Sequence, residues 1–99
     1  MTPEEANEKL DAHRQRIDEL DREIRALLNE RTKVVENIGK VKRECSLPIY
    51  EPKREEEVFR NIMDDNPGPL PADALKRVFE RIIDEMRTVQ RDRMKREQE

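Results

Sequence analysis

Apolar residues recur along the first half of the chain at alternating steps of three and four residues. The series is Ile17, Leu20, Ile24, Leu27, Val34, Ile38, Val41 and Cys45. Such spacing places side chains on one face of an α-helix. Thr2 and Pro3 suit a helix start, and Pro48 disfavours helix at the residue before it. The pattern predicts one helix over about residues 3–44, roughly 60 Å long at about 1.5 Å per residue.

Two shorter apolar patterns follow this long one. Pro52 suits the first position of a helix over about residues 52–65. The Pro- and Gly-rich stretch 66–71 is a loop, and a third helix covers about residues 72–95. Its predicted inward residues are Leu75, Val78, Phe79, Ile82, Ile83, Met86 and Val89. The fold class is therefore predicted to be all-α, with three helices per chain in one domain, 1–99.

The two shorter helices cannot cover the apolar stripe of a helix of about forty residues along its full length. Part of the long helix therefore needs a second chain. We expect an intertwined helical homodimer in which the two long helices pair, so that each site draws residues from both subunits.

Composition narrows the possible functions. Charged residues make up 45% of the chain, but they balance to a formal net charge of -3, and aromatic residues make up only 3%. A nucleic-acid partner is therefore not expected. Cys45 and His13 are the chain's single Cys and His, so we expect no metal site. Without a run of eighteen apolar residues we expect no membrane partner and a cytoplasmic location.

Several polar residues fall where the helical pattern calls for apolar ones. Arg31 occupies the position between Leu27 and Val34, and Lys42 lies eleven residues on, within roughly 20° around the helix and about 16 Å along it. Lys40 falls on the far side and is assigned to solvent. Arg14 cannot join Arg31 within one chain, but in an antiparallel dimer it could reach the partner's site.

The other two helices repeat this theme. Arg54 and Glu55 lie four residues before apolar positions of the second helix, and Gln90 lies four residues after Met86. The inward cations, with a visiting Arg14, outnumber the carboxylates Glu51 and Glu55 by about two. One inward charge alone is usually a snorkelling side chain or a core ion pair, but five polar residues on three inner faces, four of them charged, favour a pocket for a small dicarboxylate.

This pattern resembles the all-helical class of chorismate mutase, and the resemblance covers the chain from about Lys9 to Gln90. It is carried by Arg14-x-x-Ile17-Asp18-x-Leu20-Asp21, Leu27-Leu28-Asn29-Glu30-Arg31, Ile38-Gly39-Lys40-Val41-Lys42, Pro48-Ile49-Tyr50-Glu51-Pro52-Lys53-Arg54-Glu55, and Phe79 through Gln90. The family implies that chorismate rearranges to prephenate for phenylalanine and tyrosine biosynthesis. The rearrangement is pericyclic, without covalent catalysis or a cofactor.

The resemblance also implies roles for individual residues. Arg31 and Arg14 of the partner subunit would bind the substrate carboxylates, supported by Arg54. Lys42 and Gln90 would flank the ether oxygen. The carboxylate Glu55 would accept the hydrogen bond of the ring hydroxyl, and Asp21 and Gly39 would be structural.

Two positions depart from the family pattern, and two other readings stay open. Glu51 stands where the family commonly has Asp, and Met86 stands where a Ser can occur. One alternative is an isochorismate-pyruvate lyase, whose loop before the second helix differs from the stretch here. The other is a non-catalytic helical dimer that serves interaction or regulation. The residues do not decide whether the chain is free-standing or was cut from a fusion enzyme.

Overall fold

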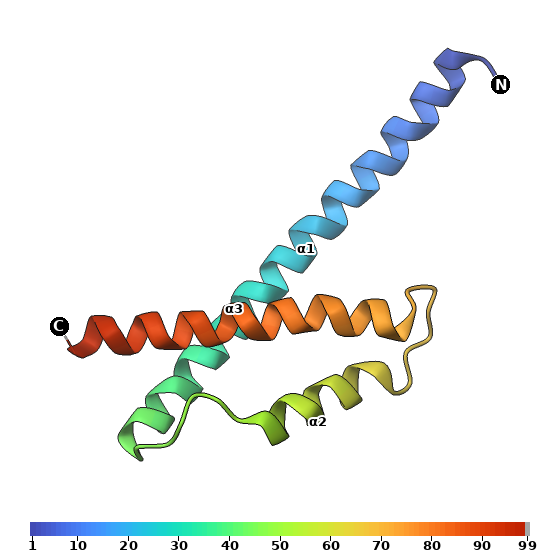
Figure 1. The fold of residues 1–99 in the computed structure, drawn as a ribbon. Coiled ribbons are helices and arrows are strands. Elements are labelled where there is room, and N and C mark those ends of the chain that lie inside the picture. The colour runs from blue at the N-terminus through green and yellow to red at the C-terminus, as the bar shows by residue number, and fades with distance from the viewer. Residues whose placement is uncertain (99) are drawn as a thin grey trace. The chain divides into compact units, whose positions relative to one another are not determined.

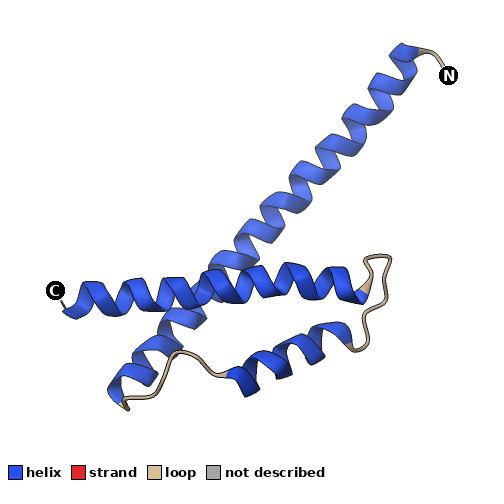
Figure 2. Cartoon of the chain, in the orientation of Figure 1, coloured by secondary structure: helices blue, strands red, loops and turns tan. Residues whose placement is uncertain are grey.

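The computed structural model describes residues 1–98, with side chains through residue 96, and the described residues contain helices and no strand (Figure 2). The helices are α1, Pro3–Glu44, α2, Pro52–Met63, and α3, Ala72–Gln98 (Figure 1). The predicted all-helical class with three helices, one of them very long, is confirmed. Glu99, the last residue of the predicted domain 1–99, lies outside the described residues.

Two helix ends differ from the predicted ones. α2 ends at Met63 rather than at Asp65, because Asp65 adopts a positive φ of 59° that no α-helix contains. α3 continues to Gln98 rather than to Lys95, since Arg, Glu and Gln are good helix formers and neither Gly nor Pro follows. The predicted start of α1 at Thr2 and Pro3 is confirmed, because the Thr2 hydroxyl caps the helix by accepting a 3.1 Å hydrogen bond from the Glu5 amide.

Two backbone hydrogen bonds cap the C-terminal end of α1. The amide of Leu47 donates to the carbonyl of Lys42 at 2.7 Å, and the amide of Ser46 donates to the carbonyl of Arg43 at 3.2 Å. These are the bonds of a Schellman motif, in which the residue after the cap adopts the left-handed conformation. That residue is Ser46, with φ at 54°. The motif turns the following loop back toward the last turn of α1.

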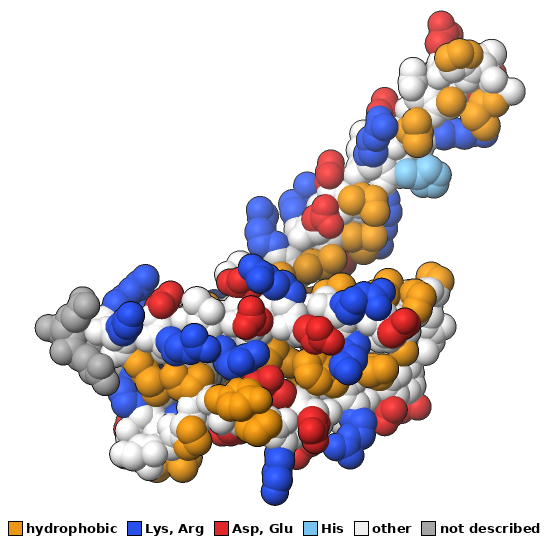
Figure 3. Space-filling model, viewed as in Figure 1, with side chains coloured by type: hydrophobic (Ala, Val, Ile, Leu, Met, Phe, Trp, Pro, Cys, Tyr) orange, Lys and Arg blue, Asp and Glu red, His pale blue; other side chains and the backbone are white. Residues whose placement is uncertain are grey.

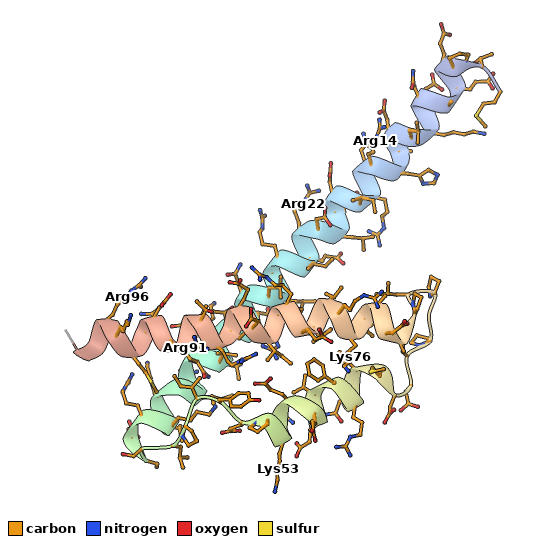
Figure 4. The ribbon with its side chains drawn as sticks, in the orientation of Figure 1. Arg14, Arg22, Lys53, Lys76, Arg91 and Arg96 are labelled. Carbon is orange, nitrogen blue, oxygen red and sulfur yellow. The ribbon has the colours of Figure 1, made fainter. Side chains whose placement is uncertain are left out.

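The chain divides into two compact units, Met1–Lys33 and Val34–Glu99, and each is described by itself. In the second unit α2 packs against α3, with Ile83 buried at their core. The ammonium of Lys76 lies 5.6 Å from the centroid of the Phe59 ring, across the two helices (Figure 4). Val78 was predicted to face inward but is exposed, because it lies five residues before Ile83 and hence about 140° around α3.

The apolar stripe of α1 is largely exposed in each unit. In the first unit Ile17, Ile24 and Leu27 are between 54% and 64% exposed, and in the second unit Val34, Ile38 and Val41 are between 44% and 57% exposed. Figure 3 shows hydrophobic side chains at the surface of α1. Contiguous apolar surface of this kind marks an interaction site. Among the described residues, no helix has the length and apolar character needed to cross a membrane.

Candidate active site

Lys42 is a buried cation at the end of α1. It is 9% exposed, as its predicted inward position requires. Its Nζ donates a hydrogen bond to the carbonyl of Ile49 at 3.0 Å and lies 3.3 Å from Oε1 of Glu51. The Schellman turn brings both partners into place, because it directs the loop after Ser46 back over Lys42. An ammonium has three N–H donors, and these two partners use two of them.

Gln90 is a buried amide on α3 that contacts the same half of α1. It is 7% exposed, and its Nε2 donates to the backbone carbonyl of Val35 at 3.2 Å. A Cβ built on Gly39 would lie 3.6 Å from Cγ of Gln90, so the amide side chain lies directly against this glycine. Gly39 and Lys42 are three residues apart and share a face of α1. The structure therefore buries both predicted donors, Lys42 on α1 and Gln90 on α3, with Gln90 packed against Gly39, three residues before Lys42.

Glu55 is the partly buried carboxylate at the start of α2. Its Oε2 lies 3.4 Å from Nε of Arg87 on α3, with side chains 20% and 27% exposed respectively. Arg87 was not among the site residues predicted from the sequence. The signal was present, because Arg87 lies four residues after Ile83 and three before Gln90, and both of these α3 residues are buried.

The predicted inward orientation of Arg54 is wrong for the structure of the single chain. Its side chain is 59% exposed, and its Nη1 lies 3.2 Å from Oε2 of Glu57 on the same helix. Val58, from which the orientation was extrapolated, is itself only half-buried. Arg54 therefore lies at the edge of the inward face of α2, where a guanidinium on a long side chain stays in water and forms a local ion pair.

The predicted surplus of inward positive charge depends on Arg31 and on Arg14 of a partner chain, so it stays a prediction, but the second unit contains one anion and one cation that it did not count. Lys42 lies beside Glu51, and Arg54 lies beside Glu57. The prediction counted residues by helix face, and it therefore omitted Glu57, which pairs along its own helix, and Arg87, which neutralises Glu55. Each of these cations has a carboxylate within 4 Å.

The two remaining predicted cations belong to the first unit. Arg14 is exposed, with Nη1 at 3.5 Å from Oδ1 of Asp11, and Figure 4 labels it on α1. Arg31 is half-buried. Their approach to Lys42, and that of Arg14 to a partner's site, stay predictions. Lys40 is exposed, as assigned from its position on the far side of α1.

The groups that the second unit assembles are hydrogen-bond donors and charges. A buried ammonium and a buried neutral amide on one helix face can stabilise negative charge that develops on an oxygen between them. A carboxylate held nearby can accept a hydrogen bond from a hydroxyl group. This set suits a reaction driven by orientation and electrostatic stabilisation.

Comparison with known proteins places these residues in a family. The family model described as "Chorismate mutase type II" matches residues 13–91. A bifunctional chorismate mutase/prephenate dehydratase of Aquifex aeolicus is 41% identical over 80 residues, covering 77% of this chain and 22% of the relative. The chain thus spans about a fifth of the length of the bifunctional relatives it matches.

Solved structures give matches along most of their length. A chorismate mutase of Thermus thermophilus has a TM-score of 0.82 at 36% identity, covering 84% of this chain and 94% of the other. The chorismate mutase of Helicobacter pylori in complex with prephenate also has a TM-score of 0.82, at 30% identity, covering 89% of this chain and 96% of the other. The residues that carry the family resemblance therefore lie in a fold shared with these two proteins.

Proposed function

The chain belongs to the type II chorismate mutase family, and from this premise we propose that it converts chorismate to prephenate in the cytoplasm, for phenylalanine and tyrosine biosynthesis. The observation that carries the proposal is that two donors are buried at the same part of the second unit: Lys42 on α1, and Gln90 on α3 with its side chain against Gly39 of α1. A solved relative of the same fold holds the product, prephenate.

The rearrangement breaks the ether C–O bond while a C–C bond forms at the far end of the folded enolpyruvyl arm. Negative charge builds on the ether oxygen in the transition state, so donors aimed at that oxygen lower the barrier. We assign these donations to the third N–H of Lys42 and to the second amide N–H of Gln90. Their existing bonds to Ile49 and Val35 hold both groups in place without using these protons.

The ends of the substrate are assigned to the charged residues. The guanidinium groups of Arg31 and of Arg14 of the partner subunit bind the two carboxylates. Arg54 supports them after exchanging its exposed contact with Glu57 for the substrate. Guanidinium suits this task because it binds carboxylate through two parallel hydrogen bonds. Glu55 accepts the ring hydroxyl's hydrogen bond, with Glu51 at the same end of the pocket.

We propose that the working form is an intertwined homodimer in which α1 pairs with its copy. The exposed stripe of α1 supports this arrangement, because its apolar side chains lie on one face over most of a 42-residue helix. Burying each such side chain contributes about 1.5–3 kcal/mol relative to leaving it exposed. Pairing two long helices would also carry Arg14 to the partner's site, as the shared pocket requires.

The direct test supplies chorismate and isochorismate separately to the purified chain. The proposal expects loss of chorismate absorbance with prephenate as the product. Free pyruvate formed from isochorismate would instead identify a lyase. If neither compound is consumed by a folded, dimeric protein, the chain is a non-catalytic helical module. The ion pairs of Lys42 and Arg54 would then be purely structural.

A further inference from the structure

Arg87 makes contacts with three parts of the second unit at once. Its Nε lies 3.4 Å from Oε2 of Glu55 at the start of α2, and its Nη2 lies 3.6 Å from Oδ1 of Asp84 on α3. Its Cζ lies 5.4 Å from the centroid of the Tyr50 ring, in the loop between α1 and α2. A single guanidinium thus joins the loop that carries Glu51 to the helix that carries Glu55.

The contact between the Arg87 guanidinium and the Glu55 carboxylate contributes little as a purely structural ion pair. The Nε atom is buried and makes no hydrogen bond within the described structure, although Glu55 is within ion-pair distance. Burying part of a guanidinium without completing its hydrogen bonds is costly, and a partly exposed ion pair returns little stability. The arrangement is better explained by what the positive charge does for Glu55.

We infer that Arg87 is a positioning residue that holds the Glu55 carboxylate, and offsets its charge, for recognition of the substrate's ring hydroxyl; this rests on the proposed function. A dianionic substrate that approaches an uncompensated carboxylate is repelled. The guanidinium removes that repulsion from the α3 side. The Tyr50 ring, stacked near the guanidinium, fixes its direction.

A double-mutant cycle on kcat/KM separates this positioning role from direct binding of the substrate by Arg87 and from a purely structural role. In the otherwise unchanged dimer, Arg87→Gln is expected to lower kcat/KM about tenfold, within the range that coupled neighbours show. In a Glu55→Gln background the same change is expected to cost less than about twofold, because the carboxylate it serves is already gone. Arg87→Lys, which keeps the charge, is expected to recover most of the loss.

The matched control is Arg77→Gln, a change of the same type at an exposed position of α3, which is expected to leave kcat/KM unchanged. Equal losses for Arg87→Gln with and without Glu55 would mean that Arg87 acts on the substrate directly, and would overturn the inference. A lower melting temperature of the Arg87→Gln protein with unchanged kcat/KM would also overturn the inference, because Arg87 would then be purely structural. An inactive wild-type protein would contradict the proposed function itself. If the wild type is active and the losses from Arg87→Gln and Glu55→Gln are additive, only the positioning role of Arg87 is contradicted.

Discussion

The Nζ of Lys42 lies 3.3 Å from Oε1 of Glu51, one residue before α2 begins. The lysine side chain is 11% exposed and the glutamate side chain is 42% exposed, so the pair has a buried cationic end and a solvent-facing acidic end. The pair links the end of α1 to the start of α2. In the proposed enzyme it also holds the ammonium ready for the ether oxygen.

Replacing Lys42 by Ala is expected to lower kcat at least about a hundredfold, because one preorganised donor to the ether oxygen is lost. The protein should stay folded, since the carboxylate left behind is partly exposed and can be solvated. Lys40→Ala, two residues away and exposed, is the control and should keep wild-type kcat. Near-normal turnover of a folded Lys42→Ala protein would remove Lys42 from the mechanism.

Gln90→Glu is expected to make activity pH-dependent. An ionised carboxylate only accepts hydrogen bonds, so the variant can donate to the ether oxygen only when its carboxyl is protonated. Burial disfavours the charged form and raises the pKa of such a carboxyl. Activity should therefore rise as pH falls through that pKa, while the wild-type amide shows no such rise. A variant profile parallel to the wild type would contradict the assigned role of Gln90.

Mixing Arg14→Ala chains with Arg31→Ala chains is expected to restore about a quarter of wild-type activity. Half of the dimers in an equal mixture contain one chain of each variant. In each of these dimers one site has native Arg14 and native Arg31, and the other site has both substitutions. Each variant alone should be inactive. The measurement is activity after subunit exchange has been verified with differently tagged chains. No recovery would mean that each pocket is built from one chain.

Leu27→Glu is expected to dissociate the dimer, because it places a charge in the exposed apolar stripe of α1. Sedimentation should show a smaller species whose chorismate mutase activity is lost. Arg22→Glu puts the same acid at an exposed polar position of α1, which Figure 4 labels, and should remain dimeric. A Leu27→Glu protein that sediments like the wild type would place the dimer interface elsewhere.

Ser46→Gly is expected to stabilise the protein by about 1 kcal/mol. Ser46 holds a φ of 54° in the Schellman turn, a conformation that costs an L-residue roughly 1–2 kcal/mol and glycine far less. Glycine's greater freedom in the unfolded chain offsets part of this gain. Thermal unfolding at matched protein concentration gives the change. Ser46→Ala keeps the unfavourable φ and should show no such gain.

The sequence was a good guide wherever the decisive interactions are local. The stops at Pro48 and the 66–71 loop and the start at Thr2 are encoded within a few residues, and the helices follow them. The inward positions of Lys42 and Gln90 also followed from periodicity alone. Arg87 could have been found in the same way, because it continues the steps of four and three between Ile83 and Gln90.

Arg54 shows where extrapolation along a helix fails. Stepping back four residues from a half-buried position leads to an edge, and at an edge solvation of the guanidinium decides the orientation. Val78 failed for a related reason, since an apolar side chain between two inward positions need not face the core. Helix faces did not predict the charge pairs either, because Arg54 pairs with Glu57 along its own helix and Glu55 pairs with Arg87 from another helix.

By itself the sequence determined three helices, the faces on which their apolar and charged residues lie, and the family to which they belong. Only the tertiary structure decided that the Gln90 side chain of α3 lies against Gly39 of α1, while Val34, Ile38 and Val41 stay exposed. Periodicity fixes the angle of each side chain about its own helix axis, whereas the choice of face depends on contacts between distant residues. The bond from Gln90 to Val35, 55 residues apart, is one such contact.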